Sequence, residues 1–264
     1  MMNLNSIKAV IKKPLYRIYE SRILKFLERD RLPHHIAVIL DGHRRYAKAE
    51  GLAEYRHGYE VGAEKFFEFL EWTHEFEIQA ITCWLLSKEN LDRPAAELEP
   101  LCDVLGGLVD RLPAAVANHD IELRFVGSID LLPPELAAKA KRAAELTGSG
   151  TRRLTIALGY GGRQEIVDAT KDVIAKLADE GLDPAAIADK VDANMLASHM
   201  YNPDVPDPDL VIRTSGEARL SGFLLWQSAY SEFAFVDVLW PEFRRVDFLR
   251  ALREFTHRER RFGR

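Results

Sequence analysis

The sequence predicts an α/β protein, with a single domain built around a central parallel sheet that is flanked by helices. Six apolar runs rich in β-branched residues are separated by stretches of helical periodicity, and strands that alternate with helices favour a parallel sheet. No internal repeat or low-complexity linker divides the 264 residues, and this length is ample for one large hydrophobic core.

The predicted elements alternate along the whole chain. Strands are expected at residues 35–40, 81–87, 122–127, 154–160, 209–214 and 233–240, and the clearest helices at residues 62–76, 95–111, 134–146 and 163–178. Ligands of an open parallel sheet bind beyond the carboxyl ends of its strands. The polar segments that directly follow strands are therefore the expected site, and they span residues 41–45, 87–93, 159–163 and 213–221.

The N-terminal segment is a separate feature. Apolar residues recur at roughly helical spacing over residues 4–29, interrupted at Pro14, with Lys and Arg residues among them. We expect an N-terminal amphipathic helix within residues 1–30, followed by one domain over residues 31–264. A basic amphipathic helix of this kind either lies on a lipid surface or packs on its own domain or a partner subunit.

Composition and charge indicate a soluble globular protein, with 47% apolar and 29% charged residues. The two cysteines, Cys83 and Cys102, have no CxxC spacing, which disfavours a disulfide or a metal site and fits a reducing compartment. No signal peptide or membrane-spanning run is predicted, so we expect a cytoplasmic protein, with membrane association of the N-terminal helix left open.

The charge is unevenly distributed along the chain. Residues 1–35 and residues 244–264 each carry eight Lys and Arg against three Asp and Glu, although the whole chain has a net charge of −5. Basic ends on an acidic body weakly indicate anionic partners, either a membrane surface or a polyanionic substrate. We expect no nucleic-acid partner.

The first candidate motif, Asp41-Gly42-His43-Arg44-Arg45, directly follows a predicted strand and opens a helix. The carboxylate of Asp41 is a hard ligand suited to Mg²⁺. Gly42 allows the backbone to approach a phosphate closely, and the helix N-terminus offers unpaired N–H groups. Arg44 and Arg45 add charge-assisted donors. By itself the motif also fits an ordinary turn in which Asp41 caps a helix.

The second motif spans residues 213–221, Arg-Thr-Ser-Gly-Glu-Ala-Arg-Leu-Ser, beyond another predicted strand. The guanidinium groups of Arg213 and Arg219 match phosphate oxygens in geometry, and hydroxyl groups such as that of Ser221 supply further hydrogen bonds. The segment is not a P-loop, because no GxxxxGK[ST] pattern occurs in the chain. It indicates a diphosphate clamp.

A third candidate is Glu232, at the start of an apolar strand, where a carboxylate needs a partner or a metal ion. Paired with Asp41 it would complete a Mg²⁺ site, although nothing in the sequence requires that pairing. The apolar residues of segments 66–72 and 84–86 fit ordinary core packing. An anion clamp, a metal carboxylate and abundant apolar surface together indicate an amphipathic diphosphate substrate.

At these same residues the chain resembles the cis-prenyltransferase (undecaprenyl diphosphate synthase-like) family, from about residue 35 to residue 264. The motifs that carry the resemblance are HIAVILDGHRRYA, LLSKENLDRP, LGYGGRQEI, PDPDLVIRTSGEARLSGFLLWQSAYSE and the closing RRFGR. The resemblance implies a six-stranded parallel sheet, a deep apolar tunnel and a homodimer. It also implies a Mg²⁺-dependent condensation of isopentenyl diphosphate with an allylic diphosphate, which makes a Z double bond.

The resemblance also implies roles for individual residues. Asp41 and Glu232 would hold Mg²⁺ on the diphosphates, and Ser87 and Asn90 would lie beside the reacting atoms, so that Asp41, Ser87 and Asn90 are the expected catalytic residues. The residues expected to bind substrate are Gly42, His43, Arg44, Arg45, Arg56, Arg93, Glu97, Arg213, Arg219, Ser221, Arg261 and Gly263. In the family the element that contains the last two residues reaches the neighbouring subunit's site.

The chain departs from the family pattern at three positions. His43, Tyr46 and Tyr59 stand where Asn, Trp and His are usual. His43 can still donate a hydrogen bond, and its protonation would make activity sensitive to pH near neutrality. These departures leave open an unusual coupling, such as a branched head-to-middle product.

Product length is expected to depend on Leu85 and Leu86, because bulk at this part of the tunnel shortens products in the family. Burying each five-carbon unit gains roughly 3–4 kcal/mol, whereas forcing one more unit past a misplaced side chain costs about 1–3 kcal/mol. A leucine wall therefore stops growth only if its neighbours prevent it from moving.

The chain also resembles the actinobacterial short-chain branch, which makes Z,E-farnesyl diphosphate. We therefore expect a short product made from geranyl diphosphate. A medium- or long-chain polyprenyl diphosphate synthase is one alternative, and a non-catalytic accessory subunit is another. The accessory role is disfavoured because accessory subunits usually lack part of a set that this chain retains, namely Asp41, Arg213, Arg219, Ser221, Glu232, Arg261 and Gly263.

Overall fold

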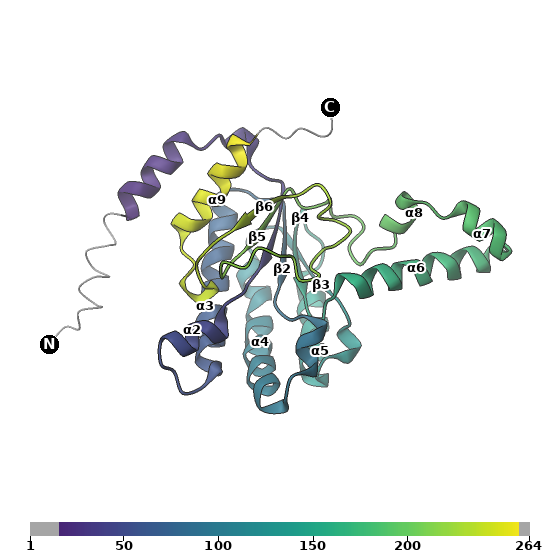
Figure 1. Cartoon of the computed structure of the whole chain (residues 1–264), viewed down its shortest axis with the longest axis horizontal. Coiled ribbons are helices and arrows are strands. Elements are labelled where there is room, and N and C mark those ends of the chain that lie inside the picture. Colours follow the sequence, from purple (N-terminus) through teal and green to yellow (C-terminus); the bar gives the residue numbers. More distant parts are fainter. Residues whose placement is uncertain (1–15, 259–264) are drawn as a thin grey trace.

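Figure 1 shows the computed structural model, which describes residues 16–258 of the chain. At its centre is a six-stranded sheet, in the spatial order β3-β4-β2-β1-β5-β6, in which all neighbouring strands are parallel. The strands are β1 (His35–Ile39), β2 (Ala80–Trp84), β3 (Ile121–Val126), β4 (Arg152–Ala157), β5 (Leu210–Arg213) and β6 (Glu232–Phe235). The predicted six-stranded parallel sheet is confirmed.

Helices lie between most consecutive strands, and one follows the last strand. They are α2 (His43–Ala49), α3 (Tyr55–Glu75), α4 (Ala95–Val116), α5 (Pro134–Thr147), α6 (Gly162–Asp179), α7 (Pro184–Lys190), α8 (Ala193–Ala197) and α9 (Arg245–His257). Short 3₁₀ helices occur at η1 (Arg29–Arg31), η2 (Lys88–Asp92), η3 (Ile129–Leu131) and η4 (Trp240–Glu242). The four predicted helices correspond to α3, α4, α5 and α6.

Helix α3 begins earlier than its prediction, at Tyr55, and it contains Gly58 and Gly62. Glycine lowers helix propensity, which is why the sequence pattern placed the start later. Both glycines are needed where α3 passes α2. A Cβ at Gly58 would lie 2.6 Å from the carbonyl oxygen of His43, and a Cβ at Gly62 would collide with the imidazole ring of His43. Tertiary contact therefore overrides propensity here.

The two faces of the sheet have different cores. In β1, Ile36 and Val38 belong to the larger core, to which α3, α4, α5 and α9 contribute. Ala37 and Ile39 point to the opposite face and belong to a smaller core, in which the rings of Trp84 and other aromatic residues pack. This alternation of side chains is the expected consequence of the pleat.

Strand β6 ends at Phe235, earlier than predicted, because the chain then turns toward the carboxyl end of β1. The backbone N–H of Trp240 donates to the carbonyl oxygen of Asp41 at 2.9 Å. The indole N–H of the same residue donates to the carbonyl oxygen of Gly62 at 2.8 Å. Trp240 is fully buried and thereby connects the segment after β1 to α3.

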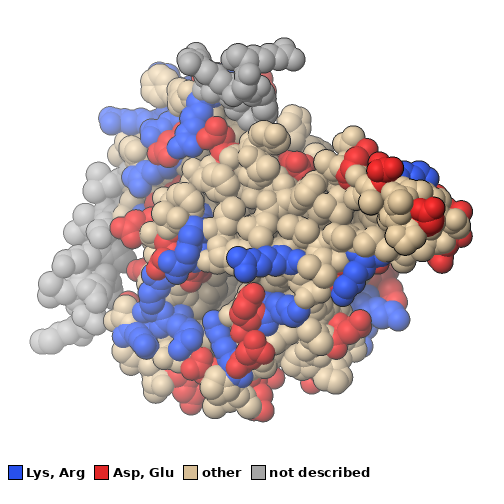
Figure 2. Space-filling model, turned by 45° about the vertical axis from the view of Figure 1, so that its right-hand side comes forward, with Lys and Arg blue, Asp and Glu red and all other residues tan. Residues whose placement is uncertain are grey.

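Helices α6, α7 and α8 form an arm that projects from one side of the sheet, with α7 and α8 folded back toward it (Figure 1). Acidic side chains gather at the far end of this arm (Figure 2). Residues 179–192 contain five Asp and Glu residues and one Lys. This end of the molecule accounts for part of the acidic middle of the chain.

Part of the predicted N-terminal helix lies within the described residues, since residues 16–26 are helical. Its Glu20 pairs with Arg245 of α9 at 2.9 Å, and Arg250 of α9 lies over the ring of Tyr19 at 4.9 Å. Ile23 and Leu27 are buried in the larger core. Residues 16–27 therefore pack on their own domain, which is one of the arrangements that the sequence predicted for this helix.

No helix within residues 16–258 has the length and apolar character needed to span a membrane.

We predict that Phe248→Ala destabilises the protein by about 3–5 kcal/mol, because the ring is fully buried against Phe69, Trp72 and Phe76. Urea unfolding followed by tryptophan fluorescence measures this change. The matched control is Leu146→Ala, whose side chain is 69% exposed on α5 and whose truncation should change stability by no more than about 0.5 kcal/mol. An equal decrease in the free energy of unfolding of the two variants would contradict the assignment of Phe248 to the core.

Candidate active site

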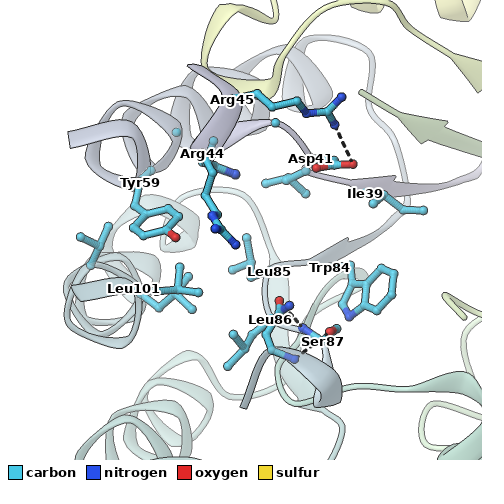
Figure 3. Close-up of a pocket in the computed structure, with 18 of the residues that line it drawn as sticks. Ile39, Asp41, Arg44, Arg45, Tyr59, Trp84, Leu85, Leu86, Ser87 and Leu101 are labelled. Carbon is cyan, nitrogen blue, oxygen red and sulfur yellow. Dashed lines mark hydrogen bonds and ion pairs between the residues drawn. The ribbon is translucent and has the colours of Figure 1, made fainter. Parts of the chain in front are cut away.

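A cavity of about 470 Å³ opens at the carboxyl ends of β1, β2 and β5, where the strand order reverses around β1. One end is polar and the other is lined by apolar side chains of α3 and α4 (Figure 3). Twelve predicted site residues line it, namely Asp41, Gly42, His43, Arg44, Arg45, Leu85, Leu86, Ser87, Asn90, Arg93, Arg213 and Ser221. The carboxyl ends of the strands therefore meet at one site, as the sequence predicted.

The carboxylate of Asp41 is held by three side chains that reach the same oxygen. Oδ2 accepts hydrogen bonds from Arg213 (2.9 Å), Ser215 (2.9 Å) and Arg45 (3.3 Å). The hydroxyl of Thr214 accepts from the Asp41 backbone N–H at 2.9 Å and donates to its carbonyl oxygen at 2.8 Å. Oδ1 has no donor within residues 16–258, so this oxygen is available to a ligand.

Asp41 is ionised at neutral pH. Partial burial acts to raise its pKa, but hydrogen bonds from Arg213 and Ser215 and the charges of Arg213 and Arg45 hold the pKa below its ordinary value. Mg²⁺ is usually bound by one or two carboxylates, with waters and phosphate oxygens completing its shell. An ionised carboxylate with one free oxygen, beside two arginines that would bind phosphate, therefore fits this ion.

Arg213 is a buried cation at the end of β5, with only 5% of its side chain exposed. In addition to Asp41, it reaches the hydroxyl of Ser221 at 2.8 Å and the carbonyl oxygen of Arg219, while its Nε has no partner within residues 16–258. Ser215 and Ser221 have positive φ values of 82° and 52°. Such a conformation costs about 1–3 kcal/mol in a non-glycine residue, so the loop is strained where it positions these two hydroxyls.

Gly42 connects Asp41 to α2. Its φ is 115°, and a Cβ there would lie 2.8 Å from the side chain of Leu239, so this turn requires glycine. The N-terminus of α2 has no side-chain cap among the described residues. The first backbone N–H groups of α2 therefore have no side-chain acceptor. They lie beside the cavity, where they would stabilise an anionic oxygen.

Two arginines on α2 point in different directions. Arg45 lies toward Asp41, donates to the carbonyl oxygen of Ser215 at 3.1 Å and pairs with Glu217 at 3.5 Å. Arg44 points away from Asp41 across the cavity (Figure 3). Its guanidinium pairs with Glu97 at 3.2 Å. Exposed pairs of this kind are weak, so a phosphate could replace these carboxylates.

His43 and Tyr59, two of the departures from the family pattern, contact each other, with ring centroids 5.9 Å apart. Burial lowers the pKa of His43 to about 4, while the charge of Asp41 acts to raise this pKa and the charge of Arg93 acts to lower it. His43 is therefore neutral at pH 7, and the expected pH sensitivity near neutrality is wrong for the chain by itself. The hydroxyl of Tyr59 is buried at the cavity without a partner in residues 16–258, which leaves a donor unused.

Ser87 and Asn90 cap η2 reciprocally. The Asn90 N–H donates to the Ser87 hydroxyl at 3.1 Å, and the Ser87 N–H donates to the Asn90 side-chain oxygen at 3.2 Å. Both side chains act here as acceptors. The Ser87 hydroxyl proton and the Asn90 amide protons are therefore left for other acceptors, and both residues line the cavity.

The apolar end of the cavity is formed mainly by α4. Its lining residues follow the spacing of one helical face and are Leu101, Val104, Leu105 and Leu108. Ala63 of α3 and Leu85 and Leu86 after β2 complete the wall. The sequence predicted only the two leucines, because the same periodicity on α4 also fits core packing, and the contact of α4 with α3 is a tertiary feature.

Three of the predicted substrate-binding residues that the structure describes, Arg56, Glu97 and Arg219, do not line this cavity. Arg56 pairs with Glu60 and Asp103, each with a substantially exposed side chain. Glu97 reaches the site only through Arg44, and the side chain of Arg219 is 65% exposed and pairs with Glu217. Arg261 and Gly263 lie outside the described residues.

The predicted pairing of Glu232 with Asp41 on one ion is wrong within a single chain. Glu232 is in register with Leu210, and Leu210 is in register with Ile36, five residues before Asp41. At about 3.3 Å per residue, Glu232 lies about 16 Å from Asp41 along the strand direction. It is also two strands away from Asp41 across the sheet. It pairs instead with Arg258 at 2.6 Å.

Sequence reasoning did not assign roles to Thr214 and Ser215, which hold Asp41, or to Lys48 and Tyr59, which line the cavity. Thr214 and Ser215 follow Arg213 directly in the second motif. Their place beyond the carboxyl end of β5 is the signal that could have identified them.

Comparison with known proteins agrees with this geometry. The family model described as "Putative undecaprenyl diphosphate synthase" matches residues 39–263. An isoprenyl transferase of Thermus thermophilus is 47% identical over 257 residues, covering 96% of this chain and 97% of that protein. A (2Z,6E)-farnesyl diphosphate synthase of Thermobifida fusca is 47% identical over 255 residues, covering 96% and 99%.

Two further comparisons are informative. A short-chain Z-isoprenyl diphosphate synthase of Mycobacterium bovis is 46% identical over 257 residues, covering 96% of this chain and 97% of that protein. The crystal structure of lavandulyl diphosphate synthase from Lavandula x intermedia, in complex with dimethylallyl diphosphate, matches with a TM-score of 0.81 and 31% identity, covering 89% of this chain and 100% of that one. The chain therefore belongs to the cis-prenyltransferase family, whose members are enzymes that transfer prenyl groups.

Proposed function

We propose that this enzyme condenses isopentenyl diphosphate with a short allylic diphosphate, geranyl diphosphate in the first instance, to give a short Z-prenyl diphosphate such as Z,E-farnesyl diphosphate. The observation that carries the proposal is a single cavity with an ionised carboxylate and arginines at one end and an apolar wall at the other. Relatives named as short-chain and farnesyl diphosphate synthases support the short product.

The polar end supplies the groups that two diphosphates need. Arg213, Ser221 and the unpaired N–H groups near Gly42 would bind phosphate oxygens, with Arg44 and Arg45 adding positive charge. Charge that develops on the departing diphosphate would be stabilised by these fixed donors, which need little reorganisation during the reaction. The donors of Ser87, Asn90 and Tyr59 are positioned to complete this shell.

Asp41 is the residue that would hold Mg²⁺, through Oδ1. The ion would neutralise diphosphate charge as a Lewis acid. Because Glu232 lies at the other end of the sheet, Asp41 is the carboxylate that we assign within one chain. Substrate oxygens and water would provide the remaining ligands.

The apolar end suits a short chain. Leu101 and Leu108 are seven residues apart, so this wall of α4 spans about 10 Å. Leu86 is almost fully buried, and Leu85 packs against the larger core, so neither moves without disturbing its neighbours. That condition is the one under which a leucine wall limits growth.

We further propose that the enzyme is a cytoplasmic homodimer, as the family resemblance implies, in which Arg261 and Gly263 reach the neighbouring site. The assignment of residues 31–264 to the catalytic domain belongs to the same proposal. Contact of the N-terminal helix with a membrane stays a prediction, although the burial of Ile23 favours packing of residues 16–26 on the protein itself.

The primary test is a product assay with purified protein, Mg²⁺, labelled isopentenyl diphosphate and, separately, dimethylallyl, geranyl or farnesyl diphosphate. We expect Z,E-farnesyl diphosphate from geranyl diphosphate, and no product in EDTA. A ladder of long polyprenyl products would retain the family and overturn the short-chain proposal. A folded protein that gives no product with any primer would support an accessory role.

Asp41→Asn should lower kcat/KM by about 10²–10³-fold, because it removes the negative charge that holds the ion while preserving the shape of the side chain. Steady-state kinetics measures the change, and circular dichroism checks the fold. Asp189→Asn on α7, an exposed residue remote from the cavity, is the matched control and should retain full activity. Undiminished turnover in Asp41→Asn would refute the proposed role of Asp41.

Ser215→Ala should move the acid limb of the pH–rate profile to higher pH. The Ser215 hydroxyl stabilises the ionised form of Asp41, so its loss raises the carboxyl pKa, and protonation at low pH then removes the active form sooner. Near pH 7 Asp41 stays ionised in both proteins. A full profile of kcat/KM, with Ser198→Ala on the exposed arm as control, distinguishes this shift from a uniform loss of activity.

Leu85→Ala should lengthen the products by at least one isoprene unit, because it opens the wall beside the growing chain. Reversed-phase chromatography of the products measures their length distribution. Leu131→Ala, at a 58% exposed leucine outside the cavity, should leave the distribution unchanged. If Leu85→Ala gave products of unaltered length, the residue that limits chain length would lie elsewhere on the wall, and the lining residues of α4 would be tested next.

A further inference from the structure

Three side chains with metal-ligating atoms gather far from the cavity described above. Glu71 and His74 lie three residues apart near the carboxyl end of α3, and His119 lies between α4 and β3. One ligand atom of each lies within 4.8 Å of those of the other two. Because α3 leads into β2 and His119 lies two residues before the start of β3, the cluster is at the amino ends of the strands, opposite to Asp41.

His74 is the member of the cluster that most needs a partner. Neither Nδ1 nor Nε2 has a hydrogen-bond partner within the part of the chain that the structure describes, and both atoms are shielded from solvent. Buried polar atoms in this state are uncommon and unfavourable unless water or an ion satisfies them. The ring instead stacks on that of His119, with centroids 3.7 Å apart and an interplanar angle of 12°.

We propose that Glu71, His74 and His119 form a binding site for one divalent transition-metal ion, of which Zn²⁺ is the best match. Two imidazoles and one carboxylate are a ligand set that Zn²⁺ accepts, with a fourth position left for water. Mg²⁺ prefers an octahedral shell of oxygen ligands. The site is therefore chemically distinct from the carboxylate of Asp41, and it is independent of the function proposed above.

The charges around the cluster decide how strongly it binds a cation. Arg152 opposes binding, although its guanidinium is engaged by the carbonyl oxygen of Ile78 at 2.7 and 3.0 Å. Glu71 brings a negative charge into the ligand set itself. Burial, together with His119 and Arg152, lowers the pKa of His74 to about 4, so at pH 7 the ring is in the unprotonated form that binds metals.

Binding requires one imidazole to turn. The lone pairs of two nearly parallel stacked rings do not converge on one ion at the Zn–N distance of about 2.0–2.1 Å. His119 is on the connection between two elements, whereas His74 is held in α3, so His119 is the ring expected to rotate. The bound ion would then link the ends of α3 and α4, the two helices that line the apolar end of the cavity.

The test uses tag-free, full-length protein that has been treated with a chelator and then kept in excess Mg²⁺, which occupies oxygen sites. Titration with Co²⁺ should give one equivalent bound per chain, with visible absorption bands of a nitrogen- and oxygen-ligated ion, and Zn²⁺ should displace it. Absence of stoichiometric Co²⁺ and Zn²⁺ binding would overturn the proposal.

Variants assign the ligands. Glu71→Gln and His119→Gln should each weaken Zn²⁺ binding by at least about tenfold, as removal of even an outer-shell partner does. His57→Gln, at an exposed histidine on the same helix, should bind as wild type does. Equal affinity in all three variants would refute the site. Because Glu71 is exposed, its variant should fold and therefore keeps the test decisive if loss of His119 perturbs the protein.

Discussion

The ion pair between Asp41 and Arg213 joins the carboxyl ends of β1 and β5, and the polar half of the site is arranged around it. Arg213 is almost fully buried, so its charge is tolerable only because a carboxylate, a hydroxyl and a carbonyl oxygen surround it. Because the pair uses only one oxygen of Asp41 and leaves Nε of Arg213 without a partner within residues 16–258, both residues keep capacity for a ligand. The ion pair that joins the two strands therefore also contributes to ligand binding, since Asp41 can bind a cation and Arg213 can bind an anion.

The polar and apolar ends of the cavity are connected by α3. Gly62 allows the ring of His43 to pack against this helix, and its carbonyl oxygen accepts the indole N–H of Trp240. One turn of α3 therefore fixes the start of α2 and the segment that follows β6. The next residue of the same helix, Ala63, is part of the apolar wall. The position of the diphosphate groups relative to the hydrocarbon chain is consequently set by a single rigid element.

The sequence was sufficient to predict the sheet and most of the polar end, because Asp41, Ser87 and Arg213 each follow an apolar run, and parallel strands bring such positions together. The same rule argues against Glu232, which begins its strand and therefore lies at the amino end of the sheet. The wall of α4 and the contact between His74 and His119 depend on how helices and loops pack, which local patterns do not encode. The pKa of His43 depends on burial for the same reason.

The polar end has more donors than acceptors, and this imbalance is its most informative chemical property. Ser87 and Asn90 use acceptor atoms to cap η2, so their side-chain donors have no acceptor within residues 16–258, and the local turn is kept. The hydroxyl of Tyr59 and Nε of Arg213 likewise lack acceptors among the described residues. Unsatisfied donors beside an apolar wall are unfavourable until an anion with a hydrocarbon chain binds, because such a ligand supplies oxygens to one end and covers the other. An amphipathic diphosphate meets both requirements at once, whereas inorganic phosphate or a neutral lipid meets only one.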